Sequence, residues 1–268
     1  MGDNGGVTEP STITIASDHV HAEIAPTEGG RLAQLSIDGT PVLVGHTPGV
    51  EPTGWGSYPM VPWAGRIRNG RFTFDGVDYQ LPINFGEHAI HGVGFTSAWT
   101  VHDQTDRTVA LHLVMPDDER WPFGGLVGQQ LMVDDGGITM SITVTATDRA
   151  FPVSFGWHPW FRKPSALDFH PIAMYRRDDD HITVDELVEV PEGPWDDCFA
   201  NTEPIGIEVD GIPLRLTSNC GVWVVYDEPT YATCIEPQTG PPDAFNIAIR
   251  RVLPGDSISA WYRIELRG

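Results

Sequence analysis

The chain has 268 residues, of which 37 are acidic and 16 are lysine or arginine, so its formal net charge at pH 7 is −21. This excess of negative charge argues against a protein that binds nucleic acid or anionic membrane surfaces, because both need local positive potential. A content of 40% hydrophobic and 20% charged residues is ordinary for a soluble globular protein with a substantial core.

The sequence also indicates in which cellular compartment the protein works. Three cysteines without framework spacing, Cys198, Cys220 and Cys234, predict reduced thiols. Residues 1–6 lack the charged and apolar regions of a signal peptide. No apolar run approaches the roughly 20 residues that span a bilayer. We therefore expect a cytoplasmic protein that is not associated with a membrane.

Short runs in which apolar and polar residues alternate follow one another from about residue 12 to the C-terminus, as in half-buried strands. Asp-Gly pairs at Asp38, Asp75, Asp135 and Asp210 separate several of these runs. They predict tight hairpins, because such turns need residues with positive φ. No window shows a sustained helical period. The sequence thus predicts an all-β fold of short antiparallel strands, either a sandwich or a barrel.

No linker-like break interrupts this strand pattern. We therefore expect one domain over residues 11–268, preceded by a flexible N-terminal tail over residues 1–10. Segments rich in Pro, Gly and aromatic residues do interrupt the alternation, and we expect them to be loops that carry the functional site. They are residues 55–70, 84–94, 154–164, 191–201 and 235–246.

Glu236 and His158 are the leading candidates for chemistry. A general base needs a fixed carboxylate, and the prolines around Glu236 predict a rigid turn. His158 lies between Trp157 and Trp160, an apolar setting that can shift the pKa of an imidazole, and tryptophan faces stack on pyranose rings. The ordinary alternatives are a glutamate that binds turn amides or an arginine, and a core histidine with one backbone hydrogen bond.

Four further positions carry weaker signals. His91 follows His88 by three residues, but H-x-x-H without a third ligand does not make a metal site. Arg66 can donate to sugar hydroxyls or a phosphate, or form a surface ion pair. Asp196 and Asp197 can accept hydrogen bonds from hydroxyls, or simply form a turn. The chain has no P-loop and no dinucleotide fingerprint, so we expect no nucleotide cofactor, and we expect no metal.

Taken in order, six segments of the chain resemble motifs of the aldose 1-epimerases, or galactose mutarotases. Each motif alone is loose, but together, in order and at fitting separations, they cover nearly the whole chain. Val93, Trp157 and His88 depart from the motifs, so the resemblance does not identify the sugar. The matching segments are residues 26–32 (P-x-x-G-G-R-L), 65–72 (N-R-I-x-N-G-x-F), 84–92 (N-x-G-x-N-x-L-H-G), 156–161 (H-x-Y/W-F), 195–199 (D-H-x-F) and 235–246 (E-x-Q…P-D-A-F-N).

The resemblance implies a large antiparallel β-sandwich of the galactose mutarotase-like (supersandwich) type. It implies an isomerase that interconverts the α and β anomers of an aldohexose, with Glu236 as general base and His158 as general acid. His91 would be a second active-site histidine that supports the transition state. A base with a pKa below that of its acid would start in the required protonation states near neutral pH.

The resemblance further implies that the partner is a monosaccharide and that no cofactor takes part. We expect the chain to act as a monomer or a homodimer. Alignment on Phe199 favours Asp196 over Asp197 as a sugar ligand. The residues that we assign to sugar binding are Arg66, Asp196, Asp197, Gln238 and Trp160.

Two other functions compete with this one. A mutarotase of hexose 6-phosphates would need a basic cluster for the phosphate, and arginines are available for it. They are Arg68, Arg71, Arg162, Arg176 and Arg177. A carbohydrate-binding protein on the same scaffold would use the nine tryptophans without catalysis. The presence of both an acid and a base candidate favours the enzyme.

Overall fold

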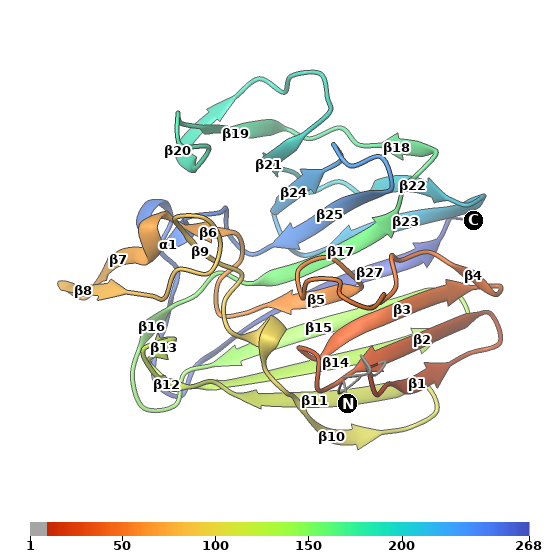
Figure 1. The fold of residues 1–268 in the computed structure, drawn as a ribbon, viewed down its shortest axis with the longest axis horizontal. Helices are drawn as coiled ribbons and strands as arrows, with labels where there is room; N and C mark the ends of the chain where they lie inside the picture. Colours follow the sequence, from red (N-terminus) through yellow and green to blue (C-terminus); the bar gives the residue numbers. More distant parts are fainter. Residues whose placement is uncertain (1–9, 268) are drawn as a thin grey trace, which may run out of the picture.

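The computed structural model describes residues 10–267, which form almost entirely β-structure. Two large sheets lie face to face (Figure 1). The strand pairs within them are antiparallel. The predicted all-β antiparallel sandwich is therefore confirmed. The predicted N-terminal tail lies outside the described residues apart from Pro10.

The larger sheet has eleven strands and contains parts of four of the five segments that the sequence singled out for function. Its central strands are β17 and β25, which pair with each other. In sheet order it comprises β1 (Ile13–Ala16), β2 (Val20–Ala25), β3 (Arg31–Ile37), β5 (Ser57–Met60), β17 (Gly156–Arg162), β25 (Ala232–Gln238), β24 (Val222–Tyr226), β21 (Asp196–Ala200), β19 (Ala173–Arg177) and β20 (Thr183–Val188), with β4 (Thr40–Pro41) beside β3.

The smaller sheet has eight strands and closes the other side of the core. In sheet order it comprises β10 (Thr100–Gln104), β11 (Thr108–Val114), β14 (Leu126–Asp134), β15 (Gly137–Thr145), β27 (Ser257–Leu266), β23 (Ile212–Ser218), β22 (Ile205–Val209) and β18 (Ala166–Asp168). Between the sheets, Trp157 and Trp223 of the larger sheet meet Tyr262 of the smaller one with ring centroids 6.0 and 5.9 Å apart.

Short paired segments and single helical turns complete the structure. The only α-helix among the described residues, α1 (Ala244–Ile247), has four residues, in agreement with the missing helical period. The remaining strands are β6 (Arg66–Ile67), β7 (Arg71–Phe74), β8 (Val77–Gln80), β9 (Ala89–Ile90), β12 (Asp117–Asp118), β13 (Trp121–Pro122), β16 (Phe151–Pro152) and β26 (Arg251–Val252), and the 3-10 turns are residues 68–70 and 94–96.

All four Asp-Gly pairs lie at hairpin turns, but only three of them have the predicted positive φ; the exception is Asp135-Gly136, between β14 and β15. Asp38, Asp75 and Asp210 have φ of 49°, 52° and 47°, and the glycine after each has φ between 76° and 81°. Two consecutive residues with positive φ are what a two-residue hairpin turn requires. These turns join β3 to β4, β7 to β8 and β22 to β23, so the sequence placed them correctly.

Four of the five expected loops are wrong in part of their conformation, because they contain strands of the larger sheet. Residues 57–60, within the first of them, are strand β5. Residues 156–162, 196–200 and 232–238 are strands β17, β21 and β25 of the larger sheet. Every residue of β25 and all but Arg162 of β17 are buried, so neither strand shows the alternation that marks a half-exposed strand.

Two prolines also make these central strands hard to recognise from the sequence. Pro159 of β17 and Pro237 of β25 cannot donate ladder hydrogen bonds. The paired Cα partners of the two strands are Gly156–Gln238 and then Trp160–Cys234 onward. The register is the same on both sides of the prolines, so the strands stay aligned across the gap between these pairs.

Gly92 fixes the backbone beside a candidate histidine. Gly92 has φ of 72° and His91 before it has φ of 61°. A Cβ built on Gly92 would lie 1.9 Å from the carbonyl oxygen of Val61. That oxygen accepts hydrogen bonds from the N–H groups of Val93 and Gly94, at 2.8 and 3.0 Å. The close approach therefore holds the His91 segment against residues 61–62.

Gly92→Ala tests this constraint against Gly211→Ala, where φ is 81° but nothing lies within 4 Å of the added Cβ. We expect the control to lose about 1–2 kcal/mol of unfolding free energy through the left-handed conformation alone. Gly92→Ala should lose a further ~1–3 kcal/mol through overpacking. Urea denaturation measures both, and equal losses would contradict the close approach.

Candidate active site

The candidate site lies on the face of the larger sheet that is turned away from the smaller sheet. Successive strand residues point to opposite faces, so Cys234, Glu236 and Gln238 of β25 share one face while Ile235 points into the core. On β17, His158 and Trp160 share the site face, and Trp157 lies in the core. One strand face thus supplies the core and the other supplies the site.

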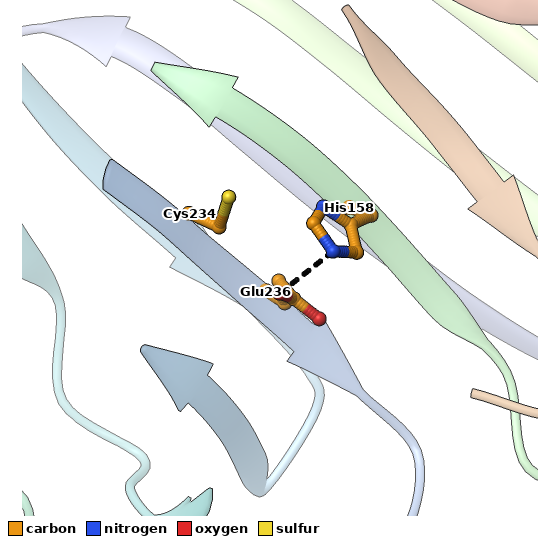
Figure 2. Close-up of side chains that lie close together, drawn as sticks. All are labelled: His158, Cys234 and Glu236. Carbon is orange, nitrogen blue, oxygen red and sulfur yellow. Dashed lines mark ion pairs between the residues drawn. The ribbon is translucent and has the colours of Figure 1, made fainter. Parts of the chain in front are cut away.

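His158 and Glu236 are in direct contact. The register between β17 and β25 puts His158 level with Glu236, midway between the pairs Gly156–Gln238 and Trp160–Cys234. His158 Nε2 lies 3.1 Å from Glu236 Oε1 (Figure 2). The other carboxyl oxygen, Oε2, accepts a hydrogen bond of 3.1 Å from Gln238 Nε2. Both oxygens of the carboxyl group are therefore held by neighbours, as a catalytic carboxyl requires.

Aromatic rings fix the orientation of His158. Tyr58 of β5 stacks on the imidazole at 4.7 Å with an interplanar angle of 21°, and Trp160 lies nearly parallel to it at 5.5 Å. His91 approaches edge-on, with ring centroids 5.0 Å apart and planes at 87°. With its ring packed on these sides, His158 has little rotational freedom.

His91 is a hydrogen-bond donor toward the site. Its Nδ1 accepts the backbone N–H of Gly65 at 3.3 Å, so the neutral ring carries its proton on Nε2. Burial lowers the pKa of His91 well below its usual value, and His158 lowers it further. The ring therefore stays neutral and can donate one hydrogen bond without carrying charge.

Burial acts on the acid–base pair in opposite directions. It raises the pKa of Glu236 well above its usual value, with a further contribution from Asp196. It lowers the pKa of His158 to about 3. This order is the reverse of the expectation that the base has the lower pKa. Because the two groups touch, we treat them as one unit that holds a single proton and has no net charge.

The pair lies in a pocket of about 370 Å³, within the size range of small-molecule sites. Charged side chains at the pocket are few and mostly acidic. Among the described residues Arg66 has no ion pair, and its guanidinium lies over the Phe85 ring at 5.3 Å. The lining residues that matter here are Tyr58, Arg66, Phe85, His91, His158, Trp160, Asp196, Tyr226, Glu228, Glu236 and Gln238.

Only one residue of the Asp196–Asp197 pair lines this pocket. Asp196 pairs with Tyr226 across β21 and β24 and faces the pocket. Arg177 contacts both carboxylates, since its Nη1 lies 3.4 Å from Asp196 Oδ2 and its Nε lies 3.0 Å from Asp197 Oδ1. Asp197 is not among the residues that line the main pocket. It lines a small neighbouring cavity of about 30 Å³. Of the two, Asp196 is the candidate for contact with a ligand in the main pocket.

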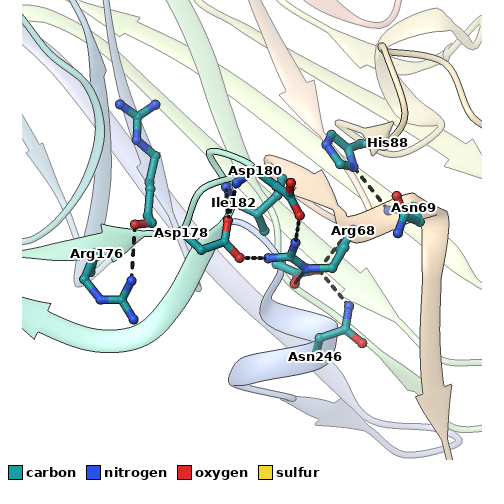
Figure 3. A network of polar contacts seen from close by, with 10 residues as sticks. Arg68, Asn69, His88, Arg176, Asp178, Asp180, Ile182 and Asn246 are labelled. Carbon is teal, nitrogen blue, oxygen red and sulfur yellow. Dashed lines mark hydrogen bonds and ion pairs between the residues drawn. The ribbon is translucent and has the colours of Figure 1, made fainter.

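An ion-pair network braces the wall that carries Arg66. The guanidinium of Arg68 binds Asp178, and it binds Asp180 at 3.0 Å (Figure 3). The backbone N–H of Arg68 donates to Asp243 Oδ1 at 2.9 Å, next to α1. Asn246 of α1 donates to the same oxygen at 2.7 Å. Asp243 thus ties the segment of Arg66 to the turn after β25.

Sequence reasoning missed several pocket residues. Tyr58 lay within an expected site segment, but nothing in the sequence distinguished it from its neighbours. Tyr226 and Glu228 lie at and after the end of β24, outside every segment that we expected to be functional. Only the pairing of β24 with β25 brings these two residues to the pocket.

A larger groove of about 620 Å³ lies on the other side of the His91 segment. Asn84, Gly92 and Val93 contribute to its wall, and its lining contains no histidine, carboxylate or cysteine. It therefore lacks acid–base groups, and the smaller pocket is the candidate active site.

Within the described part of the chain, no helix is long and apolar enough to cross a membrane.

The fold and the pocket together define a galactose mutarotase-like β-sandwich with a buried carboxyl–imidazole pair. The sequence profile of the aldose 1-epimerase family matches residues 11–265. The chain therefore belongs to the aldose 1-epimerase family.

Individual relatives agree with this membership. The uncharacterized protein YihR of Escherichia coli K12 is 26% identical over 90% of this chain and 88% of its own length. The aldose 1-epimerase of the same strain is 34% identical, but the match spans 46% of this chain and 37% of that protein. A solved structure of a GalM/aldose epimerase homologue from C. elegans has a TM-score of 0.84 at 17% identity, covering 97% of this chain and 99% of that one.

The proton shared by Glu236 and His158 leads to a prediction about how stability depends on pH. Ionisation of a carboxyl group destabilises the folded protein when its pKa is higher in the folded state than in the unfolded state. The free energy of unfolding therefore falls as the pH rises above about 4.5. Glu236→Gln removes this effect. We expect its stability relative to wild type to increase by about 1 kcal/mol or more between pH 5 and pH 8. Urea denaturation at both pH values measures the change.

Glu192→Gln, at an exposed loop position, is the control and should show no such pH dependence. A relative stability of Glu236→Gln that decreased with rising pH would mean that the fold stabilises the carboxylate, and the proton would then belong to His158.

Proposed function

We propose that this protein is an aldose 1-epimerase that interconverts the α and β anomers of an unphosphorylated aldohexose. The observation that carries the proposal is the 3.1 Å contact between His158 and Glu236 inside a pocket of monosaccharide size. Mutarotation exchanges protons at two oxygens, O1 and the ring oxygen, that are bonded to the same carbon. An acid and a base that touch each other can reach both of these oxygens at the same time.

The reaction needs one proton removed and one delivered. Glu236, as the carboxylate, takes the proton of the O1 hydroxyl while His158, as the imidazolium, donates its proton to the ring oxygen. The C1–O5 bond breaks and an aldehyde forms. Rotation about C1–C2 presents the other face of the carbonyl, and the reverse proton transfers close the ring. Each positioned transfer contributes about 10²–10⁴-fold.

The neighbours of the pair support this assignment of roles. The required state places the shared proton on His158, although burial alone favours the neutral pair. Gln238 donates to Glu236, and Arg66 lowers the pKa of its carboxyl group, so both favour the carboxylate. His91 donates through Nε2 to the oxygen that gains negative charge as the ring opens. Transfer within the pair changes no net charge, and contact between the two charges that it creates offsets part of their desolvation cost.

Polar and aromatic groups around the pair suit the rest of a pyranose. Arg66 donates to sugar hydroxyls, and Asp196 and the Oε1 atom of Gln238 accept from them. That amide oxygen is buried and has no partner among the described residues. The Trp160 ring offers an apolar face. Asp197, which we also assigned to sugar binding, acts through Arg177 instead. We expect the reaction to take place in the cytoplasm.

The ion pairs of the chain argue against a phosphorylated sugar. The arginines available for a phosphate are engaged: Arg68 with Asp178 and Asp180, Arg71 with Gln80, Arg162 with Asp210, Arg176 with Glu186, and Arg177 with Asp196 and Asp197. Arg66 is the only basic residue at the pocket apart from its histidines, and it faces the carboxyl groups of Asp196, Glu228 and Glu236. A phosphate dianion would meet more negative than positive charge there.

Glu236→Gln tests the reaction. We expect the rate of mutarotation, measured by polarimetry on freshly dissolved α-glucose and α-galactose, to fall by about 10²–10⁴-fold. Glu192→Gln is the matched control and should keep the wild-type rate. Sugar binding, measured by calorimetry, should survive in both variants. A Glu236→Gln rate within a few-fold of wild type would contradict the assigned base.

The non-catalytic alternative gives a different result in the same experiment. A carbohydrate-binding protein would bind sugar by calorimetry, and wild-type protein would not accelerate mutarotation at all.

A comparison of glucose with glucose 6-phosphate tests the substrate class. We expect kcat/KM for the phosphorylated sugar to be at least about tenfold lower, which corresponds to about 1.4 kcal/mol of charge repulsion. Mutarotation of each sugar is followed by polarimetry under identical buffer and salt conditions. A preference for the phosphorylated sugar would contradict the charge argument and support the hexose 6-phosphate mutarotase.

A further inference from the structure

Cys234 lies beside the acid–base pair but has no part in the proposed reaction. A ring nitrogen of His158, the sulfur of Cys234 and a carboxyl oxygen of Glu236 all lie within 4.8 Å of one another, and all three residues are buried. Cys234 and Glu236 are two positions apart on β25, so their side chains point the same way, toward His158 on β17 (Figure 2). The strand geometry therefore brings three different metal-binding atoms close together.

We propose that His158, Cys234 and Glu236 form a binding site for Zn²⁺, which occupies the place of the shared proton and blocks the pocket to sugar. Zn²⁺ accepts sulfur, nitrogen and oxygen ligands in a tetrahedral arrangement. Mg²⁺ and Ca²⁺ select oxygen ligands and have little affinity for a thiolate–imidazole pair. The donor set therefore favours zinc among the common divalent cations.

The distances are compatible with zinc after a small contraction. Ligand atoms at ~2.0–2.3 Å from a tetrahedral zinc ion lie about 3.3–3.8 Å apart. The present separations are 4.8 Å at most, so the donors must approach by up to about 1–1.5 Å. Rotation of the Cys234 side chain supplies most of this movement, because His158 Nε2 and Glu236 Oε1 already lie 3.1 Å apart. The fourth coordination position faces the pocket, where water would occupy it.

Charge balance favours the complex in this buried place. Before binding, the thiol of Cys234 is neutral, and the His158–Glu236 pair with its one proton is neutral. Binding of Zn²⁺ releases the thiol proton and the shared proton, which leaves a thiolate, a carboxylate and a neutral imidazole around the ion. The net charge is again zero, so the exchange of two protons for one zinc ion does not add charge to the interior.

Occupation of the site would stop mutarotation directly. The zinc ion takes the carboxylate oxygen that removes the O1 proton and the imidazole nitrogen that serves the ring oxygen. Inhibition therefore rests on the proposed function, whereas metal binding does not. An experiment that measures both quantities separates the two proposals.

The test uses ZnCl₂ and the full chain, freed of metal with a chelator. We expect calorimetry in buffers of different ionisation enthalpy to show one Zn²⁺ bound with release of two protons. Polarimetry should show loss of mutarotation at the same zinc concentrations, and MgCl₂ should have no effect. Cys234→Ala should keep the metal-free rate within a few-fold, while its zinc affinity and zinc inhibition weaken by at least about 100-fold.

Cys198→Ala is the matched control, since Cys198 is also a buried free thiol in the larger sheet but not one of the three ligands. It should bind zinc like wild type. If Cys234→Ala does not fold, Cys234→Ser preserves the side-chain volume and removes the thiolate. Wild-type protein that binds no stoichiometric zinc would overturn the proposal, as would a Cys234 variant that binds zinc like wild type or equal inhibition by Mg²⁺.

Cys234-dependent zinc binding by a protein that does not accelerate mutarotation would confirm the metal site and refute the proposed enzyme.

Discussion

The register between β17 and β25 is the constraint on which the site depends. Because side chains alternate across a strand, a slip of one residue would turn Glu236 into the core and bring Ile235 to the pocket. Pro159 and Pro237 deprive the strands of ladder hydrogen bonds at this point, so the register is set by the pairs on either side. Packing of Trp157 and Ile235 in the core reinforces it, because a slip of one residue would remove both side chains from the core.

The contact that this register creates must offset a large desolvation cost. An isolated buried charge is expensive, and breaking a buried pair by removing one partner typically costs about 3–5 kcal/mol. The pair avoids much of this cost by sharing one proton. Because the pair is neutral, two ionisable groups can be buried in a chain with a net charge of −21. A neutral pair also suits an uncharged ligand. A polar but neutral ligand exchanges with water there without unbalancing the interior.

The sequence predicted the outer parts of the fold better than its centre. The Asp-Gly turns and strands such as β14, which alternates between buried and exposed residues, follow local rules and were found. Strands β5, β17 and β25 were mistaken for loops, because prolines and burial on both faces remove the alternation that identifies a strand. Strand β21 was also mistaken for a loop, because its residues do not alternate between buried and exposed. Glu236, His158, His91 and Arg66 were singled out within their own segments and received their expected roles through the family resemblance, and the fold brings all four to one pocket.

What the sequence did not supply was proximity across strands. Tyr58 and Tyr226 belong to the pocket through pairing with β17 and β25, and no local pattern encodes such pairing. The same holds for Cys234, which the sequence identified only as a reduced thiol. The order of the pKa values of Glu236 and His158 was also missed, since it depends on burial, and burial is known only once the sheets are packed.

The position of β27 has a consequence for how the molecule is made. This strand follows every other strand in the chain, yet it lies inside the smaller sheet, between β15 and β23 (Figure 1). The four strands β10, β11, β14 and β15 and the three strands β18, β22 and β23 therefore remain two separate half-sheets until residues 257–266 have left the ribosome. A nascent chain that stalls earlier exposes two unpaired strand edges and an open core. The smaller sheet becomes continuous only when β27 joins the two halves.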